Sequence, residues 1–154
     1  MQWIRLSILT VGMVVSVACA TMSGVKEQYL VCPYDTVWDT ALESMNDRPI
    51  TVRDKAKGLI ETDWVETEVA QRHFGMFNRE GIGGVERARM TLLVKRVDDV
   101  TSVSLAENRE AWHRRGGVTQ QATKWWPIEP SQEAMNAVLN RLNAKLKERG
   151  CPAV

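Results

Sequence analysis

The chain has 154 residues, 44% of them hydrophobic and 25% charged, and its formal net charge is +1. This length is typical of one globular domain. A charge so close to zero argues against a nucleic-acid binder, which would carry a basic excess, and against a general attraction to anionic membranes.

The chain opens with the features of an export signal. One cation, Arg5, precedes the uncharged segment LSILTVGMVVSVA at residues 6–18. These 13 residues are too few to cross a bilayer, which takes about 20, but they fit the apolar core of a signal peptide. We predict that residues 1–18 are removed, which leaves 19 basic and 19 acidic residues in the mature chain.

The end of this signal, Ser16-Val17-Ala18-Cys19-Ala20, resembles a bacterial lipobox, in which the cysteine becomes the first mature residue and carries the lipid. Ser16 stands where that motif prefers an aliphatic residue, and an ordinary signal peptide cleaved near Ala18 or Ala20 is the alternative. With lipid on Cys19, residues 19–28 form a tether. Because Ala20 rather than Asp follows the cysteine, the sorting rule of such lipoproteins implies the outer membrane, with the domain facing the periplasm.

Two other cysteines, Cys32 and Cys151, remain in the mature chain. An even number of cysteines in an oxidising compartment favours a disulfide, and two separate thiols are the alternative. Because the bridge would close a loop of over a hundred residues, the chain-entropy model gives it on the order of 4 to 5 kcal/mol.

The first predicted elements are a short strand and a helix. The β-branched and aromatic residues of QYLVCPY, residues 28–34, favour a strand that ends at Pro33. A helical stripe follows and stops at Asn46, shortly before Pro49. The stripe consists of Val37, Trp38, Ala41, Leu42 and Met45.

The middle of the chain has the two-residue alternation of β-strands. Gly58 can take the positive φ of a hairpin turn between the first two of them. In the second strand, Ile60, Thr62 and Trp64 are expected on one face. The predicted strands cover residues 50–54, 59–69, 86–97 and 101–112, which together make an antiparallel meander.

A second helix is predicted after Pro130-Ser131, with Gly150 as its C-terminal cap. Its apolar stripe consists of Met135, Val138, Leu139, Leu142 and Leu146. The fold class is therefore α+β in the order β-α-β-β-β-β-α: a two-layer sandwich in which both helices cover one face of an antiparallel sheet. Residues 29–154 form this single domain.

The sequence offers no catalytic or metal-binding constellation. His73 and His113 have no partner at metal-ligand spacing, and the nucleophile elbow G-x-S-x-G is absent. The carboxylates of residues 61–68 are expected on a solvated strand face. We therefore predict a protein that is not an enzyme and that uses no cofactor and no metal.

Two segments have the composition of interaction surfaces. Residues 71–84 form a long hairpin connection, and long connections with apolar residues are often functional. Tryptophans beside basic residues, the usual anchors of protein contacts, mark the second segment near residues 112–126. These tryptophans could instead cap the open end of the sheet. The candidate partner-binding residues are Phe74, Met76, Phe77, Trp112, Trp125 and Trp126.

The stretch PYDTVWDTALESMND…ITVRDKAKGLIETDW resembles the opening unit of BamC-like (NlpB/DapX) lipoprotein domains. The matching positions are Val37, Trp38, Leu42, Gly58, Ile60, Thr62 and Trp64. The resemblance implies a helix-grip fold and a non-enzymatic role as an accessory or adaptor in outer-membrane protein assembly or envelope organisation, through an envelope protein partner. BamC itself has two such domains and a long N-terminal segment that contacts its partner. This chain has room for one domain, so that partner contact is not carried over.

The VWD stretch, residues 37–39, is also similar to START/Bet v 1-like proteins, in which the last helix closes an apolar cavity. The alternative function is therefore a periplasmic carrier of a hydrophobic ligand. A hydrolase is a weaker third possibility, since no catalytic constellation supports it. An apolar void of several hundred Å³ under the last helix would favour the carrier. A filled core with exposed aromatic residues would favour the adaptor.

Overall fold

A computed structural model describes residues 24–68, 73–74, 79–80, 84–112 and 124–151 of the chain. Its elements in chain order are β1 (Val25–Leu30), α1 (Tyr34–Ser44), β2 (Ile50–Asp54), β3 (Leu59–Thr62), β4 (Val65–Glu68), β5 (His73–Phe74), β6 (Arg79–Glu80), β7 (Val85–Val97), β8 (Val100–Trp112), β9 (Trp125–Ile128) and α2 (Gln132–Glu148). Every strand pairing among them is antiparallel. The α+β class with an antiparallel sheet and two helices is thereby confirmed.

The order of elements agrees only in part with the predicted one. The described residues contain eight strands between the helices rather than four. The strand expected at residues 59–69 is divided into β3 and β4, and β5, β6 and β9 were not predicted. In addition, β1 begins at Val25, so the last four residues of the predicted tether belong to the sheet.

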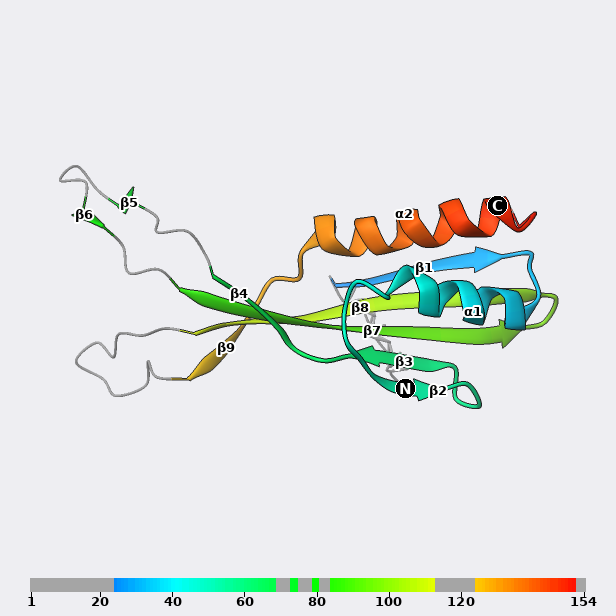
Figure 1. Cartoon of the computed structure of the whole chain (residues 1–154), viewed down its shortest axis with the longest axis horizontal. Helices are drawn as coiled ribbons and strands as arrows, with labels where there is room; N and C mark the ends of the chain where they lie inside the picture. The colour runs from blue at the N-terminus through cyan, green and yellow to red at the C-terminus, as the bar shows by residue number, and fades with distance from the viewer. Residues whose placement is uncertain (1–23, 69–72, 75–78, 81–83, 113–123, 152–154) are drawn as a thin grey trace, which may run out of the picture.

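A long hairpin made of β7 and β8 forms the centre of the sheet. Its strands pair without interruption from Val85 with Trp112 to Val97 with Val100. The main sheet has the order β1-β8-β7-β3-β2, and β4 and β9 extend it by pairing with β7 and β8. Figure 1 shows that α1 and α2 lie along the half of the hairpin near its turn, while β4 and β9 flank the other half.

The core lies between the helices and the sheet. Alternate residues of the strands point toward the helices, and the helical stripes meet them, which matches the predicted periodicities. The strands contribute Leu30, Ile60, Met90, Leu92, Val94, Val103 and Leu105. The helices, with Met45 just after α1, contribute Val37, Trp38, Ala41, Met135, Val138, Leu142 and Leu146. All of these residues are buried.

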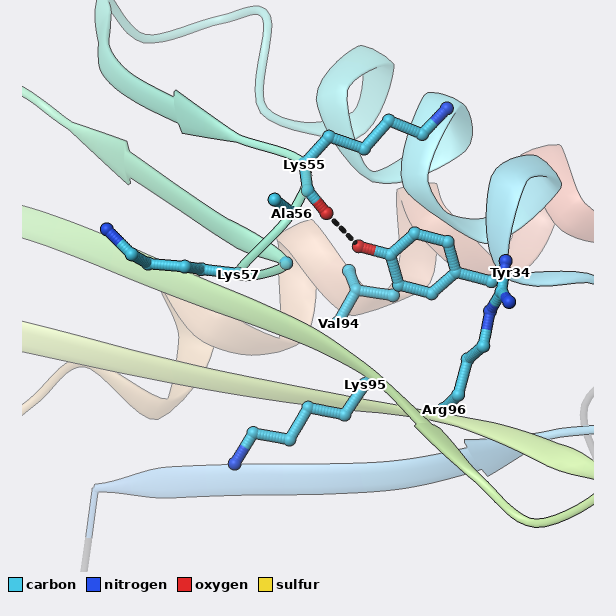
Figure 2. A pocket seen from close by; sticks show the side chains of 8 residues that line it. Tyr34, Lys55, Ala56, Lys57, Val94, Lys95 and Arg96 are labelled. Carbon is cyan, nitrogen blue, oxygen red and sulfur yellow. Dashed lines mark hydrogen bonds between the residues drawn. The ribbon is translucent and has the colours of Figure 1, made fainter.

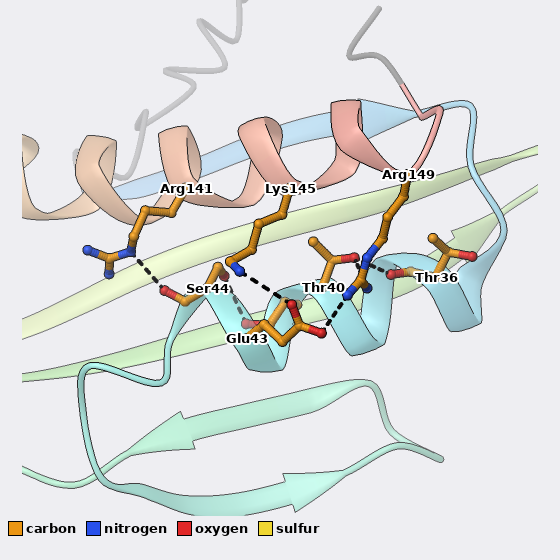
Figure 3. Close-up of polar contacts among 8 residues, drawn as sticks. Thr36, Thr40, Glu43, Ser44, Arg141, Lys145 and Arg149 are labelled. Atoms are coloured by element: carbon orange, nitrogen blue, oxygen red, sulfur yellow. Dashed lines mark hydrogen bonds and ion pairs between the residues drawn. The ribbon is translucent and has the colours of Figure 1, made fainter.

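Polar contacts join the two helices where they lie side by side (Figure 3). Arg149 donates to the hydroxyl of Thr40 at 2.7 Å and forms an ion pair with Glu43, which also accepts from Lys145 at 3.4 Å. Nearer the middle of α2, Arg141 donates to the backbone carbonyl of Ser44, the last residue of α1, at 3.0 Å. The basic side of α2 therefore holds α1 in place beyond the apolar contact.

A helix cap and a disulfide stabilise the two ends of α2. The side chain of Ser131, the residue before α2, accepts from the backbone N–H of Ala134, which caps the helix. At the other end a disulfide joins Cys32, just after β1, to Cys151, just after α2, with the Cα atoms 5.6 Å apart. The bridge spans 119 residues and links the first and last elements of the fold.

A bulge between β3 and β4 turns Trp64 away from the core. Glu61 pairs with Thr91 and Val65 with Ala88, so four steps on one strand match three on β7. Across this gap the backbone N–H of Met90 donates to the hydroxyl of Thr62 at 3.0 Å. Because one extra residue reverses which face a side chain occupies, the expectation that Trp64 shares the face of Ile60 and Thr62 is wrong.

Candidate interaction surface

The residues that bound the two predicted interaction segments lie in one row across the sheet. Glu68 of β4 pairs with Val85 of β7, Val85 pairs with Trp112 of β8, and Trp112 pairs with Trp125 of β9. The described strand ends that border residues 69–83 and 113–123 therefore lie side by side at the same end of the sheet. We call Glu68, Val85, Trp112 and Trp125 the strand-end row. Neighbouring strands are about 4.8 Å apart, so the row is about 14 Å wide.

Three tryptophans, two of which belong to this row, gather with two arginines on the sheet face opposite the helices, which we call the outer face. The Arg87 guanidinium carbon lies 4.4 Å from the ring centroid of Trp64 and 4.1 Å from that of Trp125. Arg89 lies 5.0 Å from the Trp64 ring, and the rings of Trp112 and Trp125 are 5.5 Å apart. We call these five residues the tryptophan–arginine cluster. Their common face follows from the register, because Arg87 and Arg89 alternate with the buried Met90 and Leu92 of β7.

Carboxylates neutralise the two guanidinium groups of the cluster. Arg87 contacts Glu110 at 2.6 Å, with both side chains about one quarter exposed, and Arg89 contacts Glu61 at 3.0 Å. Each cation–π contact contributes on the order of 0.5 to 2 kcal/mol, more where water is excluded. The side chains are therefore held in place by contacts within the protein, and the surface they form has apolar aromatic area without a large net charge.

This arrangement is suited to protein contact. Tryptophan and arginine are the residue types that most often dominate the binding energy of protein interfaces. Fixed side chains lose less conformational entropy on association than mobile ones. Trp64, Trp112 and Trp125 are half-buried rather than fully covered, so each residue keeps some exposed surface.

The sequence identified part of this surface. It indicated Trp112 and Trp125, and the structure places both in the strand-end row and in the cluster. Trp126 lies on the opposite sheet face, where Lys124 Nζ is 4.2 Å from its ring centroid. Trp64, Arg87 and Arg89 were not predicted as site residues. The outward alternation of the arginines was visible in the sequence, but the bulge that brings Trp64 to them was not.

Four predicted residues fall wholly or partly outside the described part of the chain. Cys19, Met76 and Phe77 lie outside the described residues, as does the side chain of Phe74. The backbone of Phe74 is described and belongs to β5, which pairs with β6.

A cleft of about 430 Å³ lies at the other end of the sheet (Figure 2). The ring of Tyr34 forms one wall, and its hydroxyl donates to the carbonyl of Lys55 at 2.6 Å. Lys55 is paired with Asp35 at 2.8 Å, which lowers the pKa of the carboxyl and raises the pKa of the ammonium group. Arg96 lies 4.9 Å from the Tyr34 ring centroid. Lys57, which also lines the cleft, is paired with Asp54 at 3.0 Å.

The space beneath α2 is filled. Met135, Val138, Leu142 and Leu146 are at most 1% exposed, and strand residues that are also buried lie against them. A smaller cleft near the start of α2 measures about 140 Å³ and has charged walls, including Arg48, Glu86 and Arg109. Neither described cleft is the apolar cavity that the carrier alternative requires.

Within the described ranges, no three His, Cys, Asp or Glu side chains gather as a metal site would need. Neither helix of the described fold is long and apolar enough to cross a membrane.

Comparison with known proteins gives little to add to this geometry. No protein-family model and no curated protein matches the chain. Among solved structures, a DUF4468 family protein from Bacteroides ovatus is similar over 81% of both chains, with 12% sequence identity and a TM-score of 0.42. At these values the likeness carries no statement about function.

Proposed function

We propose that the chain is a non-enzymatic lipoprotein of the BamC-like, helix-grip type, which acts by protein contacts at the periplasmic side of the outer membrane. Its role is that of an accessory or adaptor in outer-membrane protein assembly or envelope organisation. The observation that supports contact with a protein is the tryptophan–arginine cluster. It lies on the sheet face that the helices leave open, beside the strand-end row.

The alternative function as a carrier of a hydrophobic ligand receives no such support. Its cavity should lie under α2, where the described core side chains are buried against one another. We therefore do not propose it.

A genetic test addresses the role directly. In cells of the source organism that lack the gene, we expect a reduced amount of folded outer-membrane β-barrel protein, measured by heat-modifiable gel mobility. The wild-type gene should restore that amount, and the double variant Trp64→Ala/Arg87→Ala should not. Arg53→Ala removes an exposed arginine from β2, away from the cluster, and is the matched control. Full restoration by the double variant would contradict the proposal, provided that both variants accumulate to wild-type levels.

The anchor is tested by mass spectrometry of the mature protein. We expect an N-terminal Cys19 that carries a diacylglyceryl group and a fatty acid. A mature protein that begins at another residue and carries no lipid would exclude the lipoprotein assignment and leave the protein-contact role to stand by itself.

A further inference from the structure

The tether joins the fold at a fixed place. Gly24, just before β1, has a φ of +140°, and a Cβ built on it would lie 3.0 Å from Cγ of Pro130. The chain therefore passes directly against the connection between β9 and α2. Val25 of β1 pairs with Ala106 of β8, and Ile128 at the end of β9 pairs with Arg109 of β8. The strands β1 and β9 therefore follow one another along the same edge of β8.

The reach of the tether brings any anchored lipid close to β9. Cys19 precedes Gly24 by five residues, and an extended chain spans at most about 3.6 Å per residue, so Cys19 lies within about 18 Å of Gly24. Trp126 pairs with Ala111, five residues along β8 from the partner of Val25, which corresponds to about 17 Å. A membrane that holds a lipid on Cys19 can therefore touch the whole of β9.

The side chains of this edge are those of a membrane interface. Trp126 and Ile128 occupy the same face of β9, and Lys124 is exposed with its ammonium group over the Trp126 ring. Tryptophan prefers the boundary between headgroups and acyl chains, and lysine extends its charge toward lipid phosphates.

The β9 edge carries a basic residue, whereas the start of α2, which also lies beside the tether, carries acidic ones. The connection to α2 and the first turn of that helix expose Glu129 and Glu133. Carboxylates are repelled by the phosphates of anionic lipids, whereas each lysine near such a surface is attracted by about 1 kcal/mol. The edge at Lys124 and Trp126 is therefore the side of the tether that a phospholipid surface favours.

We infer that the β9 edge, formed by Lys124, Trp126 and Ile128, rests on phospholipid headgroups beside the lipid anchor. This inference depends on the lipidation of Cys19 in the proposed function. Trp125 and Trp126 occupy opposite faces of β9, so the contact leaves the tryptophan–arginine cluster on the face turned away from Trp126. The anchor and the edge together would orient the domain rather than merely retain it.

The test measures which tryptophan approaches the headgroups. The mature full-length protein is produced with 5-fluorotryptophan and placed in nanodiscs of phosphatidylethanolamine and phosphatidylglycerol that contain a gadolinium-chelating lipid. Each ¹⁹F resonance is assigned by a Trp→Phe variant. We expect loss of the Trp126 resonance, while the resonances of Trp38, which is 4% exposed in the core, and of Trp64 persist. A Trp126 resonance of unchanged intensity, or an earlier loss of Trp64, would overturn the inference.

A pair of charge variants tests the electrostatic part. Lys124→Glu should restore part of the Trp126 intensity, because the new carboxylate is repelled by phosphatidylglycerol. Lys147→Glu makes the same change in the last turn of α2 and should leave the resonance lost. Equal behaviour of the two variants would contradict a local contact. Mass spectra of the same samples separate the two proposals: absence of lipid overturns the anchor and the inference together, whereas a lipidated chain with an unaffected Trp126 overturns the inference alone.

Discussion

Gly58 shows how strictly one position can be determined by the backbone around it. It lies in the turn between β2 and β3 with a φ of +68°, and a Cβ there would be 1.8 Å from the carbonyl oxygen of Val94. The backbone N–H of Val94 also donates a hydrogen bond to the carbonyl oxygen of Gly58 at 2.8 Å. The turn is therefore built directly onto β7, and only glycine leaves room for this contact.

Gly58→Ala should lower the free energy of unfolding by about 2 to 5 kcal/mol, because it adds a left-handed alanine and a collision with backbone. Gly150→Ala is the matched control: its φ is +77°, but a Cβ there meets nothing within 4 Å. We expect that variant to lose only about 1 kcal/mol. Urea unfolding of both variants checks the difference, and equal losses would show that the contact with Val94 is unimportant.

At the same scale, Trp64 shows what the sequence could not reveal. Strand alternation placed Arg87 and Arg89 outward, as the structure has them, but it also placed Trp64 in the core. The bulge that reverses Trp64 depends on pairing with β7, a strand more than twenty residues away in sequence. No local pattern marks it, so the cluster could not be predicted even though all its residues were in view.

At the scale of elements, the two helices were predictable because their apolar stripes, the Ser131 cap and Gly150 are local signals. The short strands were not. β9 is WWPI and contains a proline, and β4 is VETE with three exposed residues. Such segments become strands because the ends of β7 and β8 offer them partners, which is a tertiary effect.

The contact between α1 and α2 predicts a dependence on pH. Hydrogen bonding from Arg149 is the main cause that lowers the pKa of Glu43, with a further contribution from Lys145. Because the pKa of Glu43 is lower in the folded protein than in the unfolded chain, the contact stabilises the fold at pH values above the ordinary glutamate pKa, about 4.3. This stability is lost as the pH falls through the lowered pKa of the folded protein. Glu43→Gln should therefore reduce stability at pH 7 and leave it nearly unchanged at strongly acidic pH.

Urea unfolding at several pH values measures this difference, with Glu148→Gln at the exposed end of α2 as control. A Glu43→Gln variant that is destabilised equally at neutral and acidic pH would show that the loss is one of packing and not of charge.

For the whole molecule, the disulfide between Cys32 and Cys151 holds the first and last elements together. Closing a loop of 119 residues restricts the unfolded chain, so the double variant Cys32→Ser/Cys151→Ser should lose up to about 4 to 5 kcal/mol. The same decrease should appear when the wild-type protein is reduced with dithiothreitol. Identical urea midpoints for the oxidised and reduced proteins would indicate that the bridge contributes nothing to stability.

The shape of the whole molecule also separates two ends with different properties. The helices, the core and the disulfide occupy the half of the hairpin near its turn, while the other half carries the tryptophan–arginine cluster and the strand-end row (Figure 1). We expect substitutions in the core half to change stability and substitutions in the cluster to change association. This division is what an adaptor needs, since its binding surface can vary without loss of the fold.

The most direct test of protein contact is photo-crosslinking in living cells from a residue of the strand-end row. A photoreactive amino acid is placed at Glu68, which is exposed in β4, and in a second strain at Asn140, which is exposed on α2. If the cluster makes this contact, Glu68 yields a discrete crosslink to one envelope protein, Asn140 does not, and Trp64→Ala/Arg87→Ala abolishes the product. A crosslink of equal yield from both positions, or one that persists in the double variant, would contradict it.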